Sequence, residues 1–525
     1  MRKRWLHLVA LGLVVALAAM GCGKKAEPGG EATAGLAQSL TIGTTDKIIS
    51  MDPVWAYDYF SSVVLFNCAE TLVTYAPGAS QVSGQLASSW TVGSDGKSYT
   101  FKLRSGAKFD DGTAADANAV KAALERVRRL NVEEGAGFLL FGEGQGIDKV
   151  EVVDPTTVTI TLLAPDVTFV SKLAYTVGAI GNPKLYTDKQ MTTECHGSGP
   201  YKIVSFKEND SLEFGVNTFY AGPDKPKTPK VLIKFFDKSS AMKLALENGE
   251  IDIAFRSFTP TEIENLKENT KVKLVVGKGA QTRYIVLLSS KPPFNDLKNR
   301  QAVAAAVDRK AITDTVFKGT AAPLNSMVAQ GFDVYKDYFT SQYGAPNAAK
   351  AKDLLGGKKL TFDLWWTPTH YGDTEDEVAQ VAKRSLEATG AFQVNLQSTE
   401  WPQYKTQWKN QQMQAFLLGW YPDYQDPDDY LAPFYSTLGA KSMGAFYSNA
   451  SMDKMLGDEL QQQDVAKRNA LFDDIQKLAA QEAPYIPLWQ NNITSIAASQ
   501  PGVSGLLDTL DIAQIFRIWM LSKKK

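Results

Sequence analysis

The chain has 525 residues, too many for one compact core, so two or three domains are expected. Hydrophobic residues make up 44% of it and charged residues 22%, which is ordinary for a globular protein in water. Because 57 acidic residues offset 56 basic ones, the chain lacks the overall basic excess that nucleic-acid binding normally needs. We therefore expect no nucleic-acid partner.

The first 22 residues have the features of an export signal. Three basic residues (2–4) precede an apolar run over 8–20, and Gly21 and Cys22 follow. The run is short for a membrane-spanning helix, which needs about 20 apolar residues. The cysteine after Gly21 resembles a bacterial lipobox, although the two residues before Gly21 are not the usual ones. We expect residues 1–22 to be a lipoprotein signal peptide with Cys22 lipidated; secretion without a lipid is the alternative.

The next segments alternate between flexible and folded patterns. Residues 23–37 are small, polar and rich in Gly, so they predict a flexible tether. A strand is expected at 40–44, followed by an aromatic segment that runs into a helix. Residues 80–190 contain two expected hairpins and one amphipathic helix, which together are typical of a small α+β domain.

The second half of the chain shows regular α/β alternation. A strand at 231–236, a helix at 239–248 and a strand at 251–254 form a β-α-β unit, which implies parallel strands. Further elements are expected as follows: helix 297–317, strand 360–366, helix 375–389, strand 392–397, helix 401–411, strand 415–418 and helix 464–481, the last with Leu471, Ile475 and Leu478 on one face.

The segment 416–430 (FLLGWYPDYQDPDDY) is the most informative stretch of the chain. Its apolar start predicts a buried strand that ends at Gly419. Asp426 followed by Pro427 predicts a helix start, since Asp caps free backbone N–H groups and Pro suits the first helical position. Residues 420–425 should then form a tight loop that presents an indole and a carboxylate side by side. A plain surface turn is the alternative.

Sequence motifs for catalysis are missing. Three His residues occur in the whole chain, no HExxH or Cys/His zinc spacing is present, and there is no G-x-S-x-G elbow or Walker loop. Paired carboxylates for glycoside hydrolysis stay open, because sequence spacing says nothing about distance in space. We expect a protein that is not an enzyme, with no cofactor and no metal.

Cys68 and Cys195 remain after the expected cleavage, besides Cys22. An even pair outside the cytoplasm favours a disulfide, which would close a long loop. Two buried free thiols are the alternative.

Taken together, the sequence resembles the extracytoplasmic solute-binding proteins of peptide/nickel-type ABC importers, family 5. The resemblance runs from about residue 40 to the C-terminus, and it is carried by eight short stretches in order. These are SMDP at 50–53, ETLVTY at 70–75, QLASSW at 85–90, DGKSYTFKLR at 95–104, KFDDGT at 108–113, GSGPY at 197–201, LENGEID at 246–252 and RQAV at 300–303.

The resemblance implies an α/β, periplasmic-binding-protein-like fold with mixed sheets flanked by helices, in which three domains form two lobes joined by a hinge. One lobe would comprise 38–80, 194–285 and 489–525, and the second 286–488. Residues 81–193 would form an additional domain packed on the first lobe. Such a protein encloses its ligand between the lobes.

The resemblance also implies site residues. In peptide-binding members a Trp-x-x-Asp loop meets the ligand and the Asp binds the peptide α-ammonium, which corresponds here to Trp420 and Asp423, with Tyr421 between them. Trp401 matches a second Trp of that lobe. Tyr57 and Asp58 should face the cleft from the other lobe. Structural roles, such as a core indole for Trp401, are the alternatives.

We therefore expect the binding component of an ABC importer, a monomer anchored by lipid on the extracytoplasmic face of a membrane. It would capture peptides, mainly short ones, and deliver them to the permease transmembrane subunits. Alternatives are the same role for an oligosaccharide or a metal chelate, a secreted hydrolase, or a sensory lipoprotein.

Overall fold

The computed structural model describes residues 36–525, apart from 143, 257, 369, 373 and 499–501. The expected signal peptide, Cys22 and nearly all of the expected tether lie outside these residues. Within the described residues, no helix has both the length and the apolar character needed to cross a bilayer.

An eleven-stranded mixed sheet runs through the described part of the chain. Ten strands follow one another in hydrogen-bonded order, and β13 (Ala321–Pro323) pairs with β17. The order is β15 (Phe392–Ser398), β14 (Leu360–Trp366), β16 (Ala415–Trp420), β12 (Val272–Leu287), β17 (Tyr485–Ala498), β11 (Ile253–Phe255), β1 (Ser39–Thr44), β10 (Lys230–Phe235), β9 (Ser211–Val216) and β8 (Tyr201–Lys207).

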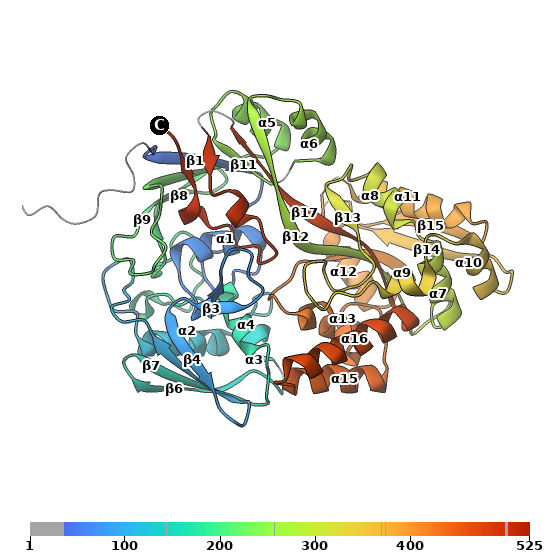
Figure 1. Cartoon of the computed structure of the whole chain (residues 1–525), viewed down its shortest axis with the longest axis horizontal. Helices are drawn as coiled ribbons and strands as arrows, with labels where there is room; N and C mark the ends of the chain where they lie inside the picture. The colour runs from blue at the N-terminus through green and yellow to red at the C-terminus, as the bar shows by residue number, and fades with distance from the viewer. Residues whose placement is uncertain (1–35, 143, 257, 369, 373, 499–501) are drawn as a thin grey trace, which may run out of the picture. The chain divides into compact units, whose positions relative to one another are not determined.

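Strands β12 and β17 are the longest of this sheet, with 16 and 14 residues, and they pair antiparallel (Figure 1). Their register shifts between Lys278 and Thr282. The expected domain limits at 285/286 and 488/489 fall inside these two continuous strands. Those limits therefore stay predictions.

The expected β-α-β unit is confirmed. Strands β10 and β11 both pair parallel to β1, which lies between them. Helix α5 (Ser239–Glu247) connects the two strands, and α6 (Pro260–Lys267) follows β11. Both helices pack their apolar residues against this region in a small core that includes Met242, Ile251 and Ile496.

Strand β16 and the last four residues of β12 are buried on both faces, which explains why residues 415–418 and 284–287 are continuously apolar. Along β16, Phe416 and Leu418 belong to one core, while Leu417 lies in the other. The Leu417 face is covered by α7 (Leu297–Ala306), α8 (Arg309–Thr315), α9 (Tyr338–Tyr343), α10 (Ala348–Leu354) and α11 (Glu375–Ala388). The Phe416 face is covered by α12 (Trp401–Lys409), α13 (Ala432–Tyr435), α14 (Thr437–Ser442), α15 (Ala450–Gln461) and α16 (Val465–Glu482).

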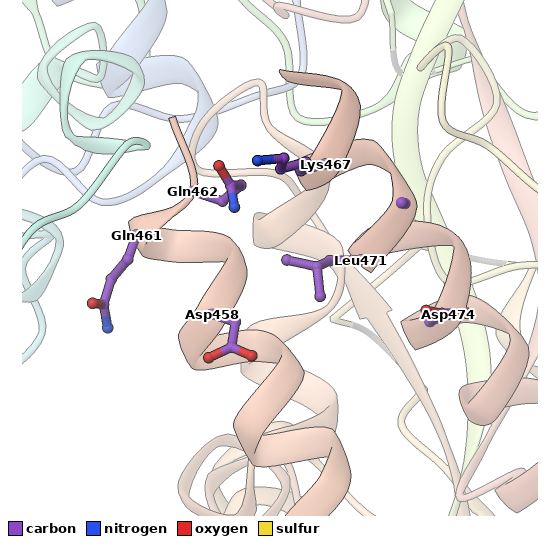
Figure 2. A pocket seen from close by; sticks show the side chains of 7 residues that line it. Asp458, Gln461, Gln462, Lys467, Leu471 and Asp474 are labelled. Atoms are coloured by element: carbon purple, nitrogen blue, oxygen red, sulfur yellow. The ribbon is translucent and has the colours of Figure 1, made fainter. Parts of the chain in front are cut away.

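Two helix predictions need correction. The helix expected over 297–317 is two helices, because Asp308 accepts a hydrogen bond from the N–H of Ala311 and starts a new one. On α16 the buried face is centred on Phe472 and Ile475. Leu471 lies instead in a surface groove of about 480 Å³ between α15 and α16 (Figure 2).

The N-terminal part contributes a second, four-stranded antiparallel sheet in the order β4 (Ala87–Val92), β5 (Ser98–Leu103), β7 (Thr157–Leu162) and β6 (Ile147–Asp154). It shares one apolar core with β1, β9 and β10. The helices of this region are α1 (Tyr59–Cys68), α2 (Ala117–Leu130), α3 (Phe138–Phe141), α4 (Phe169–Leu173), η1 (Thr176–Gly178) and η2 (Pro183–Leu185). The remaining elements are β2 (Val73–Tyr75), β3 (Val82–Gly84), β18 (Val503–Ser504), β19 (Ser522–Lys523), η3 (Pro427–Tyr430), η4 (Leu507–Thr509) and η5 (Ile518–Met520).

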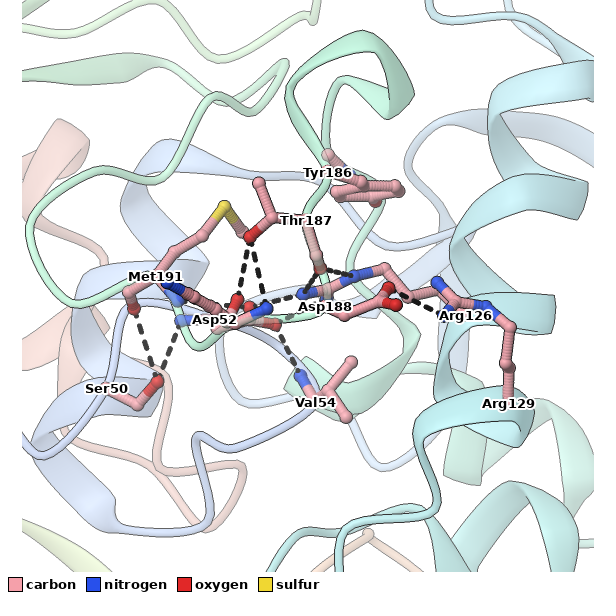
Figure 3. Close-up of polar contacts among 11 residues, drawn as sticks. Ser50, Asp52, Val54, Arg126, Arg129, Tyr186, Thr187, Asp188 and Met191 are labelled. Atoms are coloured by element: carbon pink, nitrogen blue, oxygen red, sulfur yellow. Dashed lines mark hydrogen bonds and ion pairs between the residues drawn. The ribbon is translucent and has the colours of Figure 1, made fainter.

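A buried ion pair fastens α2 to the loop before α1. Arg126 donates two hydrogen bonds of 2.7 Å to the two carboxylate oxygens of Asp52 (Figure 3). The guanidinium also donates to the carbonyl of Thr187 and lies 5.4 and 4.8 Å from the ring centroids of Trp55 and Tyr186. Both charged side chains are almost fully buried, so each depends on the other for its charge.

A disulfide joins Cys68, at the end of α1, to Cys195. The segment after Cys195 packs directly onto the helix end, where the N–H of Gly199 donates to the carbonyl of Cys68. A Cβ at Gly197 would lie 2.2 Å from the same carbonyl oxygen, so only glycine fits there.

Candidate functional site

The loop that follows β16 is anchored at both ends. Strand β16 continues to Trp420, which pairs with Thr282 of β12, so the strand is slightly longer than expected. Asp426 accepts a hydrogen bond from the N–H of Asp428, as a capping residue does, but the helix that it starts is the four-residue 3₁₀ turn η3. Arg468 donates to both oxygens of Asp426 at 2.8 and 2.7 Å, which fixes the end of the loop.

Two buried carboxylates lie at the centre of this loop. Asp423 is 7% exposed and Asp429 is 1% exposed. Asp429 accepts hydrogen bonds from the indole Nε1 of Trp420 at 3.0 Å and from the N–H of Asp423 at 3.1 Å. Tyr57, from the segment before α1, donates its hydroxyl to Asp423 Oδ2 at 3.1 Å. The bond joins residues 366 positions apart in the sequence.

Neither carboxylate has a basic partner. In the described part of the chain, no Lys, Arg or His nitrogen lies within 4.0 Å of the Asp423 or Asp429 carboxylate. Burial raises the pKa of Asp423 to about 7, although the hydrogen bond from Tyr57 acts in the opposite direction. Burial and then the neighbouring Asp423 charge raise the pKa of Asp429 well above its ordinary value. A cation placed beside these carboxylates would therefore stabilise their ionised forms.

All six residues expected at the site line one cavity of about 730 Å³. They are Tyr57, Asp58, Trp401, Trp420, Tyr421 and Asp423. Trp401, the first residue of α12, stacks on His370 with ring centroids 3.6 Å apart. Asp58 caps α1 through Oδ1, while its buried Oδ2 has no hydrogen-bond partner among the described residues. The structure thus brings these residues together around one space; their roles in binding stay predictions.

A second cavity of about 740 Å³ adjoins the first. Six residues line both: Tyr59, Arg256, His370, Tyr371, Tyr421 and Gln514. We name the cavity with Asp423 the carboxylate cavity and the other the basic cavity, because Lys238 and Arg283 line the latter. Sequence reasoning did not single out Arg256, His370 or Gln514, which are isolated residues without a motif around them.

Arg283 of β12 lines the basic cavity and contacts two aromatic residues that line both cavities. Its Nε lies 3.6 Å from a carboxylate oxygen of Glu375, and both side chains are almost fully buried. The guanidinium lies 4.0 Å from the ring centroid of Tyr371 and 5.8 Å from that of Tyr421. These contacts fix the two aromatic rings that face the cavities.

His370 adds no positive charge to the wall near neutral pH. Burial, followed by the nearby charges of Arg283 and Lys405, lowers the pKa of His370 to about 4. Its ring is thus a neutral, stacked surface. Within the described residues, no group of three His, Cys, Asp or Glu side chains is placed to hold a metal ion. The carboxylate cavity can therefore receive a cationic group between aromatic walls.

Known proteins resemble this chain over most of its length. The family model for bacterial extracellular solute-binding proteins, family 5 (middle region), matches residues 81–442. The glutathione-binding protein GsiB of Shigella dysenteriae is 28% identical over 503 residues, which cover 93% of each chain.

Solved structures share the fold. The periplasmic binding protein DppA of Helicobacter pylori, in complex with the peptide STSA, matches with a TM-score of 0.77 and 23% identity over 94% of this chain and 99% of that one. NikA of Brucella suis, in complex with Fe(III)-EDTA, matches with a TM-score of 0.81 and 22% identity over 93% of this chain and 100% of that one. The expected periplasmic-binding-protein-like α/β fold is confirmed, and the two bound ligands differ in chemistry.

Proposed function

The chain belongs to the bacterial extracellular solute-binding proteins of family 5, and on that premise we propose that it captures peptides through their amino terminus for an ABC importer. Membership places the protein outside the cytoplasm and makes it a binding component of transport, not an enzyme. Its partners are a peptide and the membrane-embedded permease subunits of the importer.

The observation that carries the proposal is the buried Asp423 carboxylate at the wall of the carboxylate cavity, with the buried Asp429 carboxylate bonded to its backbone N–H. Within the described residues, neither carboxylate has a basic group at ion-pair distance. A peptide α-ammonium would supply the missing charge. A hydrogen bond to a charged group contributes about 1.5–3 kcal/mol. The rings of Trp420 and Tyr57 would cover the ammonium and the first side chain.

The alternatives fit the cavity less well. A neutral oligosaccharide would stack on the aromatic walls but would leave the two carboxylates without a counter-charge. An anionic metal chelate would place like charge against them. The GsiB relative and the DppA structure are named for glutathione binding and for a peptide complex, which supports the peptide ligand.

We also propose that the chain folds into two lobes with the following segments. Segments 38–80, 194–285 and 489–525 form one lobe, with 81–193 packed on it, and 286–488 form the other. Tyr57 comes from the first of these lobes and Asp423 from the second, so their hydrogen bond would form when the lobes close on a ligand. The protein acts as a monomer, tethered to the membrane by lipid on Cys22.

A peptide library tests the proposal. Equilibrium dialysis against synthetic di- to hexapeptides of mixed sequence, with mass spectrometry of the retained fraction, should recover peptides with a free amino terminus. Peptides with acetylated amino termini should be retained at least about tenfold less than the free peptides. The variant Asp423→Asn should retain free and acetylated peptides equally. Equal retention of free and acetylated peptides by the unmodified protein would refute the ammonium site.

The anchor needs a separate measurement. Intact-mass analysis of protein from its native membrane should show diacylation or triacylation at Cys22, and Cys22→Ala should release the protein from the membrane fraction. A mature protein of unmodified mass would show that the tether carries no lipid.

A further inference from the structure

A pair of buried carboxylates connects η3 to α15. Asp428 belongs to η3, which follows the loop that carries Asp423, and Glu459 belongs to α15. The two residues are 2% and 0% exposed. Asp428 Oδ1 and Glu459 Oε1 are both buried, and neither has a hydrogen-bond partner among the described residues. Buried polar atoms are nearly always hydrogen-bonded, so these two oxygens require an explanation.

The other oxygen of each carboxylate is already engaged. Tyr424 donates its hydroxyl to Asp428 Oδ2 at 2.6 Å, and Arg468 of α16 donates its Nε–H to Glu459 Oε2 at 2.8 Å. The same guanidinium donates to both oxygens of Asp426. In the part of the chain that the structure describes, Arg468 is the one basic residue within 4.0 Å of the Glu459 carboxylate, and Asp428 has none at that distance. One guanidinium therefore serves a group of three carboxylates.

The neighbouring helix α4 brings a lysine that is already paired. Lys172 lies 5.3 Å from the ring centroid of Tyr424, but its Nζ binds Asp166 at 2.8 Å. Close by, the N–H of Val167 donates to the carbonyl of Leu460 on α15. The charged and titratable groups that surround the pair are Arg468, Asp426, Tyr424, Asp429, Lys172 and Asp166. Carboxylates outnumber cations in this group, which favours a protonated carboxyl.

A single proton would satisfy both unpartnered oxygens. The two carboxyl groups lie within hydrogen-bonding distance of each other. With the proton on Oε1, Glu459 would donate to Asp428 Oδ1, while its Oε2 would continue to accept from Arg468. Burial, followed by the nearby Asp428 charge, raises the pKa of Glu459 well above its ordinary value, in agreement with this arrangement.

From this geometry we propose that Asp428 and Glu459 share one proton, and that this pair positions the loop that carries Asp423. Next to Asp428 in η3, Asp429 accepts the hydrogen bonds from the Trp420 indole and from the N–H of Asp423. When the proton leaves, two adjacent buried anions repel each other, and η3 moves away from α15 together with Asp429. Asp423 then loses its fixed place at the cavity wall. The consequence for peptide binding rests on the proposed function, whereas the shared proton does not.

Unfolding of the free protein at different pH values tests the shared proton. A glutamate in an unfolded chain loses its proton near a pH of about 4.3. The folded protein keeps the Glu459 proton above that pH, so the stability that the proton gives falls as the pH rises from there to the raised pKa. Relative to Glu459→Gln, the unfolding equilibrium constant of the unmodified protein should increase about tenfold for each pH unit in this range and then level off.

Peptide affinity tests the positioning role. Glu459→Gln keeps an N–H donor for Asp428 and an acceptor for Arg468, but it has no proton to lose. With a peptide retained from the di- to hexapeptide library, both proteins should bind equally below the pH at which the unfolding ratio levels off. One pH unit above it, Glu459→Gln should bind about threefold more tightly or better. Asp423 and the peptide amino group titrate in both proteins, so the ratio of affinities isolates the pair.

Two further variants serve as a second test and a control. Asp428→Asn places an amide N–H opposite Glu459 and should remove the same pH dependence of unfolding and of affinity. It also carries the test should Glu459→Gln fail to fold. Asp458→Asn removes the exposed carboxylate that precedes Glu459 on α15 and pairs with Lys454, so this variant should behave as the unmodified protein does.

The possible results separate the two parts of the inference. An unfolding ratio between the unmodified protein and Glu459→Gln that does not change with pH would refute the shared proton. A changing unfolding ratio with a constant affinity ratio would leave the proton in place and refute its positioning role. Failure of the unmodified protein to bind any peptide would refute the proposed function, and the unfolding data would still decide whether the proton is shared.

Discussion

Peptide affinity should depend on pH through Asp423. The carboxylate is buried, and its pKa is raised to about 7 by that burial. In the free protein at pH 5, Asp423 therefore carries a proton, which an incoming ammonium must displace. Because half of the Asp423 side chains are already protonated at pH 7, the dissociation constant at pH 5 should be about 50 times that at pH 7.

The amino group of the ligand determines the pH above which affinity falls again. A peptide α-amino group has a pKa of about 7.7–8.0, so its charge is lost as the pH rises above 8. Affinity should consequently be highest between about pH 7 and 8.

The contribution of Asp423 to the stability of the free protein should fall, and not rise, as the pH increases toward 7. The folded state holds the Asp423 proton more tightly than the unfolded chain does, so this group stabilises the fold most below its ordinary pKa and less as the pH rises toward 7.

Isothermal titration calorimetry with a peptide retained from the library measures this dependence. Titrations at pH 5, 6, 7 and 8, repeated in buffers of different ionisation enthalpy, give both the affinity and the number of protons released. Asp423→Asn keeps the shape of the side chain but cannot titrate, so its weaker affinity should be constant from pH 5 to 7. A dissociation constant of the unmodified protein that does not change between pH 5 and 7 would refute the reasoning.

Three further variants test the supports of the site and the fold. Arg126→Met leaves the buried Asp52 carboxylate without its partner and should destabilise the protein by about 3–5 kcal/mol in denaturant unfolding, a loss that the added change Asp52→Asn should partly reverse. A methyl group at Gly419 would lie 2.0 Å from Arg283 Nη1, so Gly419→Ala should weaken peptide binding and destabilise the fold by about 1–3 kcal/mol, by calorimetry and thermal unfolding. Cys68→Ser opens a disulfide that spans 127 residues and should lower stability by about 5 kcal/mol in the chain-entropy model, whereas an unchanged unfolding midpoint would show that the bond contributes little.

Local sequence was sufficient to predict the elements whose residues point to the core. The apolar run 416–418 predicted a buried strand, and its alternate residues do enter two separate cores. The β-α-β unit was predictable because a helix between two strands constrains them to run parallel. The helix break at 307–308 was missed, since Asp308 is followed directly by Arg309 and Lys310 and polar residues recur throughout this helical pattern.

The candidate site was only partly accessible from sequence. The loop 420–423 stood out because strand, aromatic residues and carboxylate follow one another directly. Asp429 follows the expected helix start and was not singled out from the sequence, yet it accepts hydrogen bonds from the Trp420 indole and from the N–H of Asp423. Arg256 and His370 gave no signal, because each is a single residue brought to the cavity from a distant segment by the fold.

The position of β17 has a consequence for the order in which the chain folds. This strand is formed by residues 485–498, which are synthesised well after both of its neighbours, yet it lies between β12 and β11 in the interior of the sheet. A nascent chain that lacks it would expose two unpaired strand edges and the apolar surfaces beside them. Neither half of the sheet can be completed until residues 485–498 have been synthesised, so the native sheet cannot form half by half as the chain emerges.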